Sequence, residues 1–435
     1  MRVVHWYPNL FGGGGVANAV LGLTRHQAAL GADVAIAAAA PDGPPLYEPA
    51  TAGEGVATIE WRPARTFRWG GLVWRQMSPD GAARLRALQP DIVHIHGELI
   101  PDNLRVPRVF GCPLVISPHG TFHPAVFAKS RSLAKRLYVE IARRLLYRRA
   151  AAFHALSPVE AEHIIRVFPR GNVYCVPQGP GTAGLRAGGG AIEARTGCGA
   201  SDPVDSDAIR FLFVGRLDIY TKGLDLLLTA FAEAQRRCPG RRLALRMVGP
   251  EWRGSLSWLR RRARELKIID GLRLSGALPG HAVAQALRQC DVYIQLSRHD
   301  SFPLSVVEAL LADKPAILSR AVGPVAYPEV AELPHVRIVP PDAAAAAAAM
   351  VEAAQRLHDL NAAAARHHEA LREFFSWDRA ARMQLETYSL LCAGSVSPSR
   401  PERASIHECA APGRIASPDL SSGDGATQEV TPCAR

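Results

Sequence analysis

Two carboxylates, Asp300 and Glu308, stand on either side of seven residues. The apolar run before them, Val292–Leu296, is expected to be a strand, after which Asp300 or Ser301 can cap a helix whose first turn suits Pro303. The N–H groups at such a helix start favour a phosphate. Glu308, about two turns further on, can accept hydrogen bonds from sugar hydroxyls. An ordinary capped helix on a parallel sheet is the alternative interpretation.

A pair of cations, Arg216 and Lys222, also follows an apolar run. Phe211–Val214 is expected to be a strand that ends in Gly-Arg, and Thr221–Leu228 is expected to open a helix. Both cations therefore lie at the carboxyl end of a strand, where open α/β sheets bind ligands. A guanidinium fork and an ammonium in one loop suit a diphosphate. The chain has five lysines against 46 arginines. Because lysine is so rare, its presence in this loop indicates that an ammonium group is required there. A solvated pair of loop charges is the alternative.

Taken together, these segments resemble the family-4 retaining glycosyltransferases, which have the two-domain GT-B fold. In that family a strand-Gly-Arg…Lys-Gly loop binds the donor diphosphate, and a Glu-x7-Glu motif contacts the donor sugar and the ribose. Arg216, Lys222 and Glu308 match this pattern, as does the Phe-Pro pair inside the motif, whereas Asp300 replaces the first Glu with one methylene less reach. The resemblance covers residues 1–392 and implies a donor site made of Gly13, Gly14, Arg216, Lys222, Gly249, Asp300, Ser301, Phe302, Pro303, Leu304 and Glu308.

Two loops of the first half are further candidates. The run Gly12–Gly15 follows the first expected strand and permits close approach of the backbone to a substrate or donor phosphate, although a plain tight turn is the alternative. His119 follows the expected strand Pro113–Ser117 and can donate to a sugar hydroxyl or to charge near the anomeric carbon. A structural histidine is the alternative. In the resembling family the glycine loop faces the sugar phosphate, and a His-Gly at this point acts in the active site.

We expect no essential metal and no cofactor besides the nucleoside diphosphate sugar as co-substrate. His94 and His96 alternate along an expected strand, and we interpret them as facing opposite sides, which argues against a shared metal. No Asp-x-Asp motif lies in a suitable loop, and the cationic side chains can neutralise the diphosphate instead. The eight cysteines have no CxxC or metal spacing, so they are interpreted as reduced thiols in a cytosolic chain.

Length and composition predict a globular, soluble two-domain protein. The chain has 435 residues, of which 48% are hydrophobic and 21% charged. No apolar run is long enough to cross a bilayer. The N-terminus runs directly into an expected strand without the pattern of a signal peptide. These features predict a cytoplasmic protein.

The net charge of +11 predicts an anionic partner: nucleic acid, an anionic membrane or phosphorylated ligands. The segment Lys129–Arg149 carries eight basic residues against one acid, Glu140. Apolar residues recur in it at every fourth position, namely Leu133, Leu137, Ile141 and Leu145. This pattern predicts an amphipathic helix with a basic face, suited to the inner face of the plasma membrane. A solvated helix packed on its own domain by the Leu stripe is the alternative. Without zinc-finger spacing or an RNP-like aromatic cluster, nucleic acid is not expected.

Strands that alternate with helices predict an α/β fold of two doubly wound, Rossmann-like parallel sheets facing a cleft. The expected strands are Val3–Tyr7, Val34–Ile36, Asp91–Ile95, Pro113–Ser117, Ala152–Leu156, Val173–Val176, Phe211–Val214, Leu243–Val248, Leu272–Leu274, Val292–Leu296, Ala316–Leu318 and Val336–Val339. The expected domains are residues 1–178 on the acceptor side, a linker 179–208, a nucleotide-sugar-binding domain 209–375, a helix 376–392 that the resemblance predicts to cross back, and a disordered tail 393–435.

The resulting hypothesis is a retaining glycosyltransferase that moves a sugar from a nucleoside diphosphate to a glycan or lipid-linked acceptor in polysaccharide or lipid-linked glycan biosynthesis. Arg216 and Lys222 are expected to stabilise the departing diphosphate, Asp300 to orient the donor sugar and His119 the reacting ring. In the mechanism that the resemblance implies, a donor phosphate oxygen takes the acceptor proton. A sugar-nucleotide epimerase of the same fold and a non-catalytic, membrane-associated nucleotide-sugar-binding protein are the alternatives.

Overall fold

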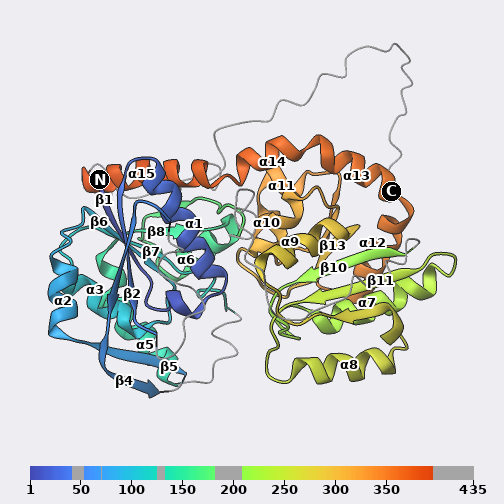
Figure 1. The fold of residues 1–435 in the computed structure, drawn as a ribbon, viewed down its shortest axis with the longest axis horizontal. Helices are drawn as coiled ribbons and strands as arrows, with labels where there is room; N and C mark the ends of the chain where they lie inside the picture. Colours follow the sequence, from blue (N-terminus) through green and yellow to red (C-terminus); the bar gives the residue numbers. More distant parts are fainter. Residues whose placement is uncertain (42–52, 70, 125–132, 182–207, 395–435) are drawn as a thin grey trace, which may run out of the picture.

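The computed structural model describes residues 1–41, 53–69, 71–124, 133–181 and 208–394. Two α/β domains lie side by side, each built on a parallel sheet (Figure 1). The expected linker and tail lie largely outside the described residues, as do Lys129 and Arg131 of the expected basic helix. No helix within the described ranges has the length and apolar character needed to cross a membrane.

The N-terminal domain contains a seven-stranded, entirely parallel sheet of order β3-β2-β1-β6-β7-β8-β9. Its strands are β1 (Arg2–Trp6), β2 (Asp33–Ala39), β3 (Val56–Trp61), β6 (Ile92–His96), β7 (Leu114–Ser117), β8 (Ala150–Ala155) and β9 (Val173–Cys175). Its helices are α1 (Gly15–Ala29), α2 (Pro79–Arg86), α3 (Val106–Val109), α5 (Leu133–Leu145) and α6 (Pro158–Val167). The apolar strands β1, β6 and β7 are buried on both faces, as parallel strands covered by helices must be.

The C-terminal domain contains a six-stranded parallel sheet of order β12-β11-β10-β13-β14-β15. Its strands are β10 (Ile209–Val214), β11 (Leu243–Val248), β12 (Leu272–Leu274), β13 (Val292–Gln295), β14 (Ala316–Ser319) and β15 (Val336–Val339). Its helices are α7 (Leu224–Arg237), α8 (Ser255–Glu265), α9 (Gly280–Gln289), α10 (Leu304–Leu311), α11 (Pro328–Ala331), α12 (Ala343–Gln355), α13 (Leu357–Arg366) and α14 (His368–Phe374). The predicted pair of doubly wound parallel sheets is thereby confirmed.

Strand order fixes where each sheet can bind a ligand. In the N-terminal sheet β1 lies between β2 and β6, and in the C-terminal sheet β10 lies between β11 and β13. The order of the strands therefore reverses at β1 and at β10, and ligands of open α/β sheets bind beyond the carboxyl ends at such points. The glycine run follows β1, and Arg216 follows β10.

A two-stranded antiparallel hairpin, β4 (Pro63–Trp69) and β5 (Leu72–Met77), was not among the expected elements. It stands apart from the N-terminal sheet, and its first strand is largely exposed. Its register pairs Phe67 with Trp74 and Trp69 with Leu72. Directly opposed residues share a face of a hairpin, so these four apolar side chains lie on the same face.

The last described helix, α15 (Trp377–Cys392), joins the two domains. It follows α14 of the C-terminal domain and runs across the N-terminal domain, where it packs beside α1 (Figure 1). Trp377 lies against Gly22 and Gly179, where an added Cβ would meet the indole at 2.5 Å. Its indole N–H donates to the Pro180 carbonyl over 2.8 Å. Further along, the Tyr388 hydroxyl is 2.5 Å from His94 Nδ1 beneath the N-terminal sheet.

Candidate active site between the two sheets

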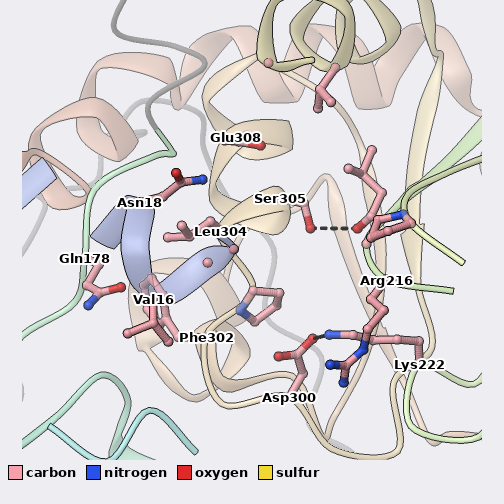
Figure 2. A pocket seen from close by; sticks show the side chains of 18 of the residues that line it. Val16, Asn18, Gln178, Arg216, Lys222, Asp300, Phe302, Leu304, Ser305 and Glu308 are labelled. Atoms are coloured by element: carbon pink, nitrogen blue, oxygen red, sulfur yellow. Dashed lines mark hydrogen bonds and ion pairs between the residues drawn. The ribbon is translucent and has the colours of Figure 1, made fainter. Parts of the chain in front are cut away.

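A cavity of about 950 Å³ lies between the carboxyl ends of the two sheets (Figure 2). Most of the residues predicted for the site line it, namely Gly14, His119, Arg216, Lys222, Asp300, Ser301, Phe302, Pro303, Leu304 and Glu308. Gly13 and Gly249, also predicted, are not among its lining residues. Gly249 instead permits close packing, because a Cβ there would collide with the Gly215 carbonyl. The cavity is large enough for a cofactor-sized ligand.

Lys222 and Asp300 form an ion pair in the cavity wall (Figure 2). The Asp300 carboxylate also accepts a hydrogen bond of 2.7 Å from the Gln295 amide. The side chains of the pair are only 16% and 15% exposed, so each charge depends largely on its partner. The Lys222 ammonium is thus neutralised by the Asp300 carboxylate.

The expected cap of the following helix is corrected by this geometry. Neither Asp300 nor Ser301 caps α10, which begins at Leu304 with Pro303 in the N-cap position and no side-chain cap. The Asp300 carboxylate is turned away to Lys222 and Gln295. Among the described residues no side chain caps the first N–H groups of α10, which is the arrangement that suits an anion.

Arg216 lies over the indole of Trp252, with its guanidinium carbon 4.3 Å from the ring centroid. Its side chain is 46% exposed and stands 3.6 Å from the Asp218 carboxylate. A cation on an aromatic face is attracted by the ring and loses little hydration, so the guanidinium stays available to a ligand. Trp252 was not predicted. It follows Gly-Pro-Glu after β11, and this position beyond a strand end was the signal that could have found it.

Side chains fasten the start of α10 to the end of β10. Ser305 donates to the Val214 carbonyl over 2.9 Å, as Figure 2 shows, and the Tyr293 hydroxyl lies 2.9 Å from Ser305 Oγ. Tyr293 also donates to Gln295 Oε1 over 2.7 Å. The helix N-terminus and the two cations are thereby fixed around one space, which suits a diphosphate.

Glu308 lies deep in the cavity, facing the chain that leaves the N-terminal domain. Its carboxylate accepts a hydrogen bond from the backbone N–H of Gly181. Burial raises its pKa to about 7, and the Gly181 hydrogen bond only partly opposes this shift. This largely buried carboxylate lines the cavity, so it is well placed to accept hydrogen bonds from ligand hydroxyls.

The loop that carries His119 is positioned by an unpredicted residue, Glu160. His119 has a φ of +53°, and the next N–H, of Gly120, donates to one oxygen of Glu160 over 2.5 Å. The other oxygen accepts from Leu156 N–H over 2.8 Å. Burial raises the pKa of Glu160 to about 7. The sequence signal was the capping box Ser-Pro-Val-Glu that starts at Ser157, whose hydroxyl caps α6.

A cluster of imidazoles lies behind His119, and it corrects one expectation. His94 and His96 do not face opposite sides: their rings stack with centroids 4.1 Å apart, because residues two apart on a strand point to the same face. Together with His5 of β1 they place ring nitrogens within 4.8 Å of one another, close enough for a metal. All six ring nitrogens, however, already have hydrogen-bond partners. The cluster is therefore a hydrogen-bonded array.

Burial keeps the array uncharged. It lowers the pKa of His5 and of His154 to about 4, and together with the nearby His154 it lowers that of His119 to about 3. The pKa values of His94 and His96 are also far below the ordinary value for the same reason. A neutral imidazole has one donor and one acceptor nitrogen, so the partners determine where each proton lies.

One chain of hydrogen bonds begins at the Val176 carbonyl. A carbonyl only accepts, so His154 donates to it from Nε2 over 2.9 Å and accepts at Nδ1 from the Ser117 hydroxyl over 2.7 Å. Since Ser117 has one proton, its oxygen accepts from His94 Nε2 over 2.6 Å. His94 Nδ1 then accepts from the Tyr388 hydroxyl. Helix α15 thus supplies the first proton of this chain.

A parallel chain reaches the cavity. Gln27 Oε1 accepts from His5 Nε2 over 2.7 Å, so His5 Nδ1 accepts from His96 Nε2 over 2.9 Å. His96 Nδ1 in turn accepts from His119 Nε2 over 3.2 Å. His119 therefore carries its proton on Nε2, toward the protein, and keeps Nδ1 as an acceptor. His119 can therefore accept a hydrogen bond from a ligand in the cavity, in contrast to the donor that we expected from the sequence.

Comparison with known families agrees with this geometry. Residues 13–180 match Glycosyltransferase Family 4, and residues 200–366 match Glycosyl transferases group 1. The chain is a GT-B glycosyltransferase of family 4. The first match covers the N-terminal domain and the second covers the C-terminal domain, and the cavity lies between these two domains.

Several proteins are similar to the glycosyltransferase. The GDP-mannose:cellobiosyl-diphosphopolyprenol alpha-mannosyltransferase of Xanthomonas oryzae is 26% identical over 73% of this chain and 78% of that protein. Glycogen synthase of Mycobacterium tuberculosis is 25% identical over 92% and 96%. Among solved structures, HepE of Anabaena with UDP and glucose has a TM-score of 0.67 at 15% identity, over 89% of this chain and 99% of that chain. These likenesses confirm the predicted GT-B fold.

The raised pKa of Glu308 predicts a pH-dependent stability of the unliganded glycosyltransferase. A carboxyl whose pKa rises from 4.5 to about 7 on folding is favourable below pH 4.5, and this benefit is lost as the pH rises through 7. At pH 8 the ionised group therefore costs up to about 3 kcal/mol. We expect Glu308→Gln to be more stable than wild type at pH 8 and to lose most of this advantage at pH 5, measured by urea unfolding.

The matched control is Glu332→Gln, which changes an exposed carboxylate of the same domain. A gain in stability at pH 8 that is equal in Glu308→Gln and Glu332→Gln would contradict its assignment to the burial of Glu308. A Glu308→Gln difference that does not change with pH would show that the carboxylate is as easily ionised in the folded chain as in the unfolded one.

The direction of the second histidine chain also leads to a prediction. His96→Leu removes the acceptor of His119 Nε2–H, and one lost buried hydrogen bond of about 1–3 kcal/mol corresponds to a roughly 5- to 150-fold lower turnover. The KM for the donor should change little. His96→Gln, whose carbonyl oxygen can accept the bond, should recover part of the rate, and the exposed His358→Leu should be neutral.

Nitrogen-15 NMR of the imidazoles checks the same assignment directly. At pH 7.5 the His119 signals should be those of the Nε2–H tautomer in the wild-type glycosyltransferase and should shift in His96→Leu. An Nδ1–H tautomer in the wild type would show that the chain runs in the opposite direction.

Proposed function

We propose that the chain is a retaining glycosyltransferase that moves a sugar from a nucleoside diphosphate to an acceptor in polysaccharide or lipid-linked glycan biosynthesis. The observation that carries the proposal is the position of Arg216 and Lys222 beside the uncapped start of α10, in one cavity at the switch point of β10. Two cations and a helix N-terminus around one space match the charge of a diphosphate.

The similar proteins support both substrates. A solved structure of HepE contains UDP and glucose, which supports a nucleotide sugar as donor. The Xanthomonas oryzae relative is named for transfer to a diphosphopolyprenol, which supports a lipid-linked acceptor. The glycogen synthase relative supports glycan synthesis in general.

The cavity suggests how transfer is catalysed. As the bond to the anomeric carbon breaks, negative charge grows on the leaving diphosphate, and Arg216 and Lys222 stabilise that charge. When Lys222 turns to the diphosphate it releases Asp300, whose carboxylate can then orient a hydroxyl of the donor sugar. Glu308 accepts from the ribose, and His119 Nδ1 accepts from a hydroxyl of the reacting ring. A donor phosphate oxygen takes the acceptor proton, so the reaction needs no protein base.

We also propose that transfer needs no metal ion, because these cations neutralise the diphosphate. The three histidines whose nitrogens lie within metal-binding distance are fully hydrogen-bonded to one another and to their neighbours. Transfer should therefore continue in EDTA at the rate measured with added magnesium.

Arg216→Ala and Lys222→Ala test the proposal. Each removes a charge that acts mainly in the transition state, so turnover should fall by roughly 100-fold or more with the fold intact. The matched control is Arg253→Ala, because Arg253 also lies over Trp252, at 5.3 Å, but does not line the cavity. The assay follows transfer from a panel of nucleotide sugars to a diphosphopolyprenol-linked acceptor.

Particular outcomes would contradict each part of this proposal. Turnover like wild type in either cavity variant would exclude the assigned role of the cations. Release of an isomerised sugar nucleotide without acceptor would identify an epimerase, and donor binding without transfer would identify a binding protein. NMR of the product should show the anomeric configuration of the donor, and an inverted linkage would exclude the retaining mechanism.

We further propose that the protein acts peripherally at the cytoplasmic face of a membrane, through the basic face of α5 and the residues after it. Arg136, Arg143, Arg144, Arg148 and Arg149 are exposed there, and Glu140 is paired with Arg144. Cations near an anionic bilayer each contribute about 1 kcal/mol, and salt screens this attraction.

Charge reversal tests this attachment. Changing Arg143, Arg144, Arg148 and Arg149 to Glu should abolish co-sedimentation with anionic liposomes at low salt, because four attractions become repulsions. The control reverses four exposed arginines of the other domain, namely Arg253, Arg260, Arg261 and Arg264. Binding that survives the first reversal, or that both reversals weaken equally, would contradict the proposal.

A further inference from the structure

The apolar stripe of α5 does not pack on its own domain. Leu137, Ile141 and Leu145 are 48%, 37% and 42% exposed. The face that packs lies one position further on, where Ala134, Tyr138, Ala142 and Leu146 are buried. The alternative of a helix packed by its Leu stripe is therefore excluded for the described residues. Three large apolar side chains are left outside the core on a helix rich in arginine.

The β4–β5 hairpin has a second set of unpacked apolar side chains. Phe67, Trp69 and Trp74 are 55%, 59% and 37% exposed. They share one face of the hairpin, and that face and the α5 stripe line the same groove, with a volume of about 530 Å³. Aliphatic side chains on one wall and aromatic rings on the other leave an open apolar channel between two elements.

The polar groups of the groove are all cationic or neutral. Arg105 and Arg108 are the only charged residues among the described residues that line it, and no carboxylate is among them. Arg105 lies over the indole of Trp74 at 5.3 Å. The nearby Asp102 is fully buried and paired with Arg75 at 2.7 Å. Its charge also attracts the Arg105 guanidinium, but its side chain does not line the groove. An apolar channel with guanidinium groups matches an apolar chain that ends in an anion.

The groove lies at the edge of the sheet that also carries the active site. Pro101 and Leu104, which line the groove, follow β6, and His119 follows β7. These strands are parallel neighbours, so their carboxyl ends meet at the same edge. Tyr138 of α5 donates to the carbonyl of Ile100 over 2.9 Å and so fixes the helix to this segment.

We propose that this groove binds the hydrocarbon chain of the lipid-linked acceptor, with its phosphate at Arg105 and Arg108. That the bound lipid is the acceptor rests on the proposed function. That the groove binds a long apolar chain with an anionic head rests on the groove itself. A chain fits better than a flat bilayer surface, because the apolar side chains of α5 and of the hairpin face a shared concave space.

The test measures binding of farnesyl phosphate by calorimetry, below its micelle concentration and without donor or vesicles. Leu137→Gln combined with Ile141→Gln should weaken binding at least tenfold, because it places polar groups in the channel. Arg105→Gln combined with Arg108→Gln should weaken binding of farnesyl phosphate but not of farnesol. The matched control, Ile165→Gln with Leu390→Gln, changes exposed apolar residues of α6 and α15 and should bind like wild type.

Equal affinity of the groove variants and wild type, or binding only to vesicles and never to monomeric farnesyl phosphate, would overturn the proposal. Transfer assays separate it from the proposed function. The Leu137→Gln and Ile141→Gln protein should show a raised KM for a lipid-linked acceptor and an unchanged KM for the lipid-free glycan. Equal changes for both acceptors would also overturn the groove assignment, whereas absence of transfer in wild type would affect only the proposed function.

Discussion

The N-terminal wall of the cleft depends for its hydrogen bonding on a set of buried, neutral imidazoles. His5, His94, His96 and His154 lie beneath the carboxyl edge of the N-terminal sheet, and His119 stands at its end in the cavity wall. A charged imidazole in such an interior would need compensation that the surroundings do not offer, so each ring stays neutral. A neutral ring both donates and accepts, which gives every chain of such rings a direction. The position of the proton on His119 in the cavity wall is therefore set by a chain of three hydrogen-bonded partners, His96, His5 and Gln27.

The same array is connected to the element that joins the two domains. Its first donor, Tyr388, belongs to α15, which begins with Trp377 against the glycines of the N-terminal domain. A second contact between the domains lies near the loop that carries His119: the Tyr327 hydroxyl donates to the Leu156 carbonyl over 2.9 Å. The N–H of Leu156 is bound by Glu160, which also binds the loop after His119. Packing of the domains and placement of His119 thus share their supporting residues.

The C-terminal side of the cleft differs from the N-terminal side, because its side chains are charged and remain available to a ligand. Lys222 is neutralised by Asp300, whereas the half-exposed Arg216 lies over an indole and is 3.6 Å from the Asp218 carboxylate. A largely buried ion pair gains little net stability, because desolvation offsets most of the attraction. The diphosphate of the proposed donor carries more charge than one carboxylate, so in the proposed reaction it can take over the ammonium at small cost. The Asp300 carboxylate lies beside Lys222 and Gln295.

Much of this arrangement could be predicted from the chain. The strands that carry the site are continuous apolar runs, and Gly-Arg, Lys-Gly and His-Gly each follow such a run, so their convergence at the sheet edges follows from the parallel fold. The partners of these residues could not be predicted in the same way. The pairing of Lys222 with Asp300 joins segments 78 residues apart, and Glu160 reaches Gly120 across 40. Sequence separation hides such contacts, although the capping box at Ser157 was a local sign of one of them.

The helix α5 shows most clearly what periodicity leaves open. Its residues at every fourth position form two adjacent rows, one of Leu137, Ile141 and Leu145 and one of Ala134, Tyr138, Ala142 and Leu146. Hydrophobicity alone favours the first row for the core, yet the second one packs, because small residues allow close approach and the Tyr138 hydroxyl finds two backbone carbonyls. The more apolar row is consequently displaced toward the hairpin. An exposed apolar row that does not pack in the core indicates a site for a ligand or for a membrane surface. The arginines around the row favour a binding partner that carries negative charge.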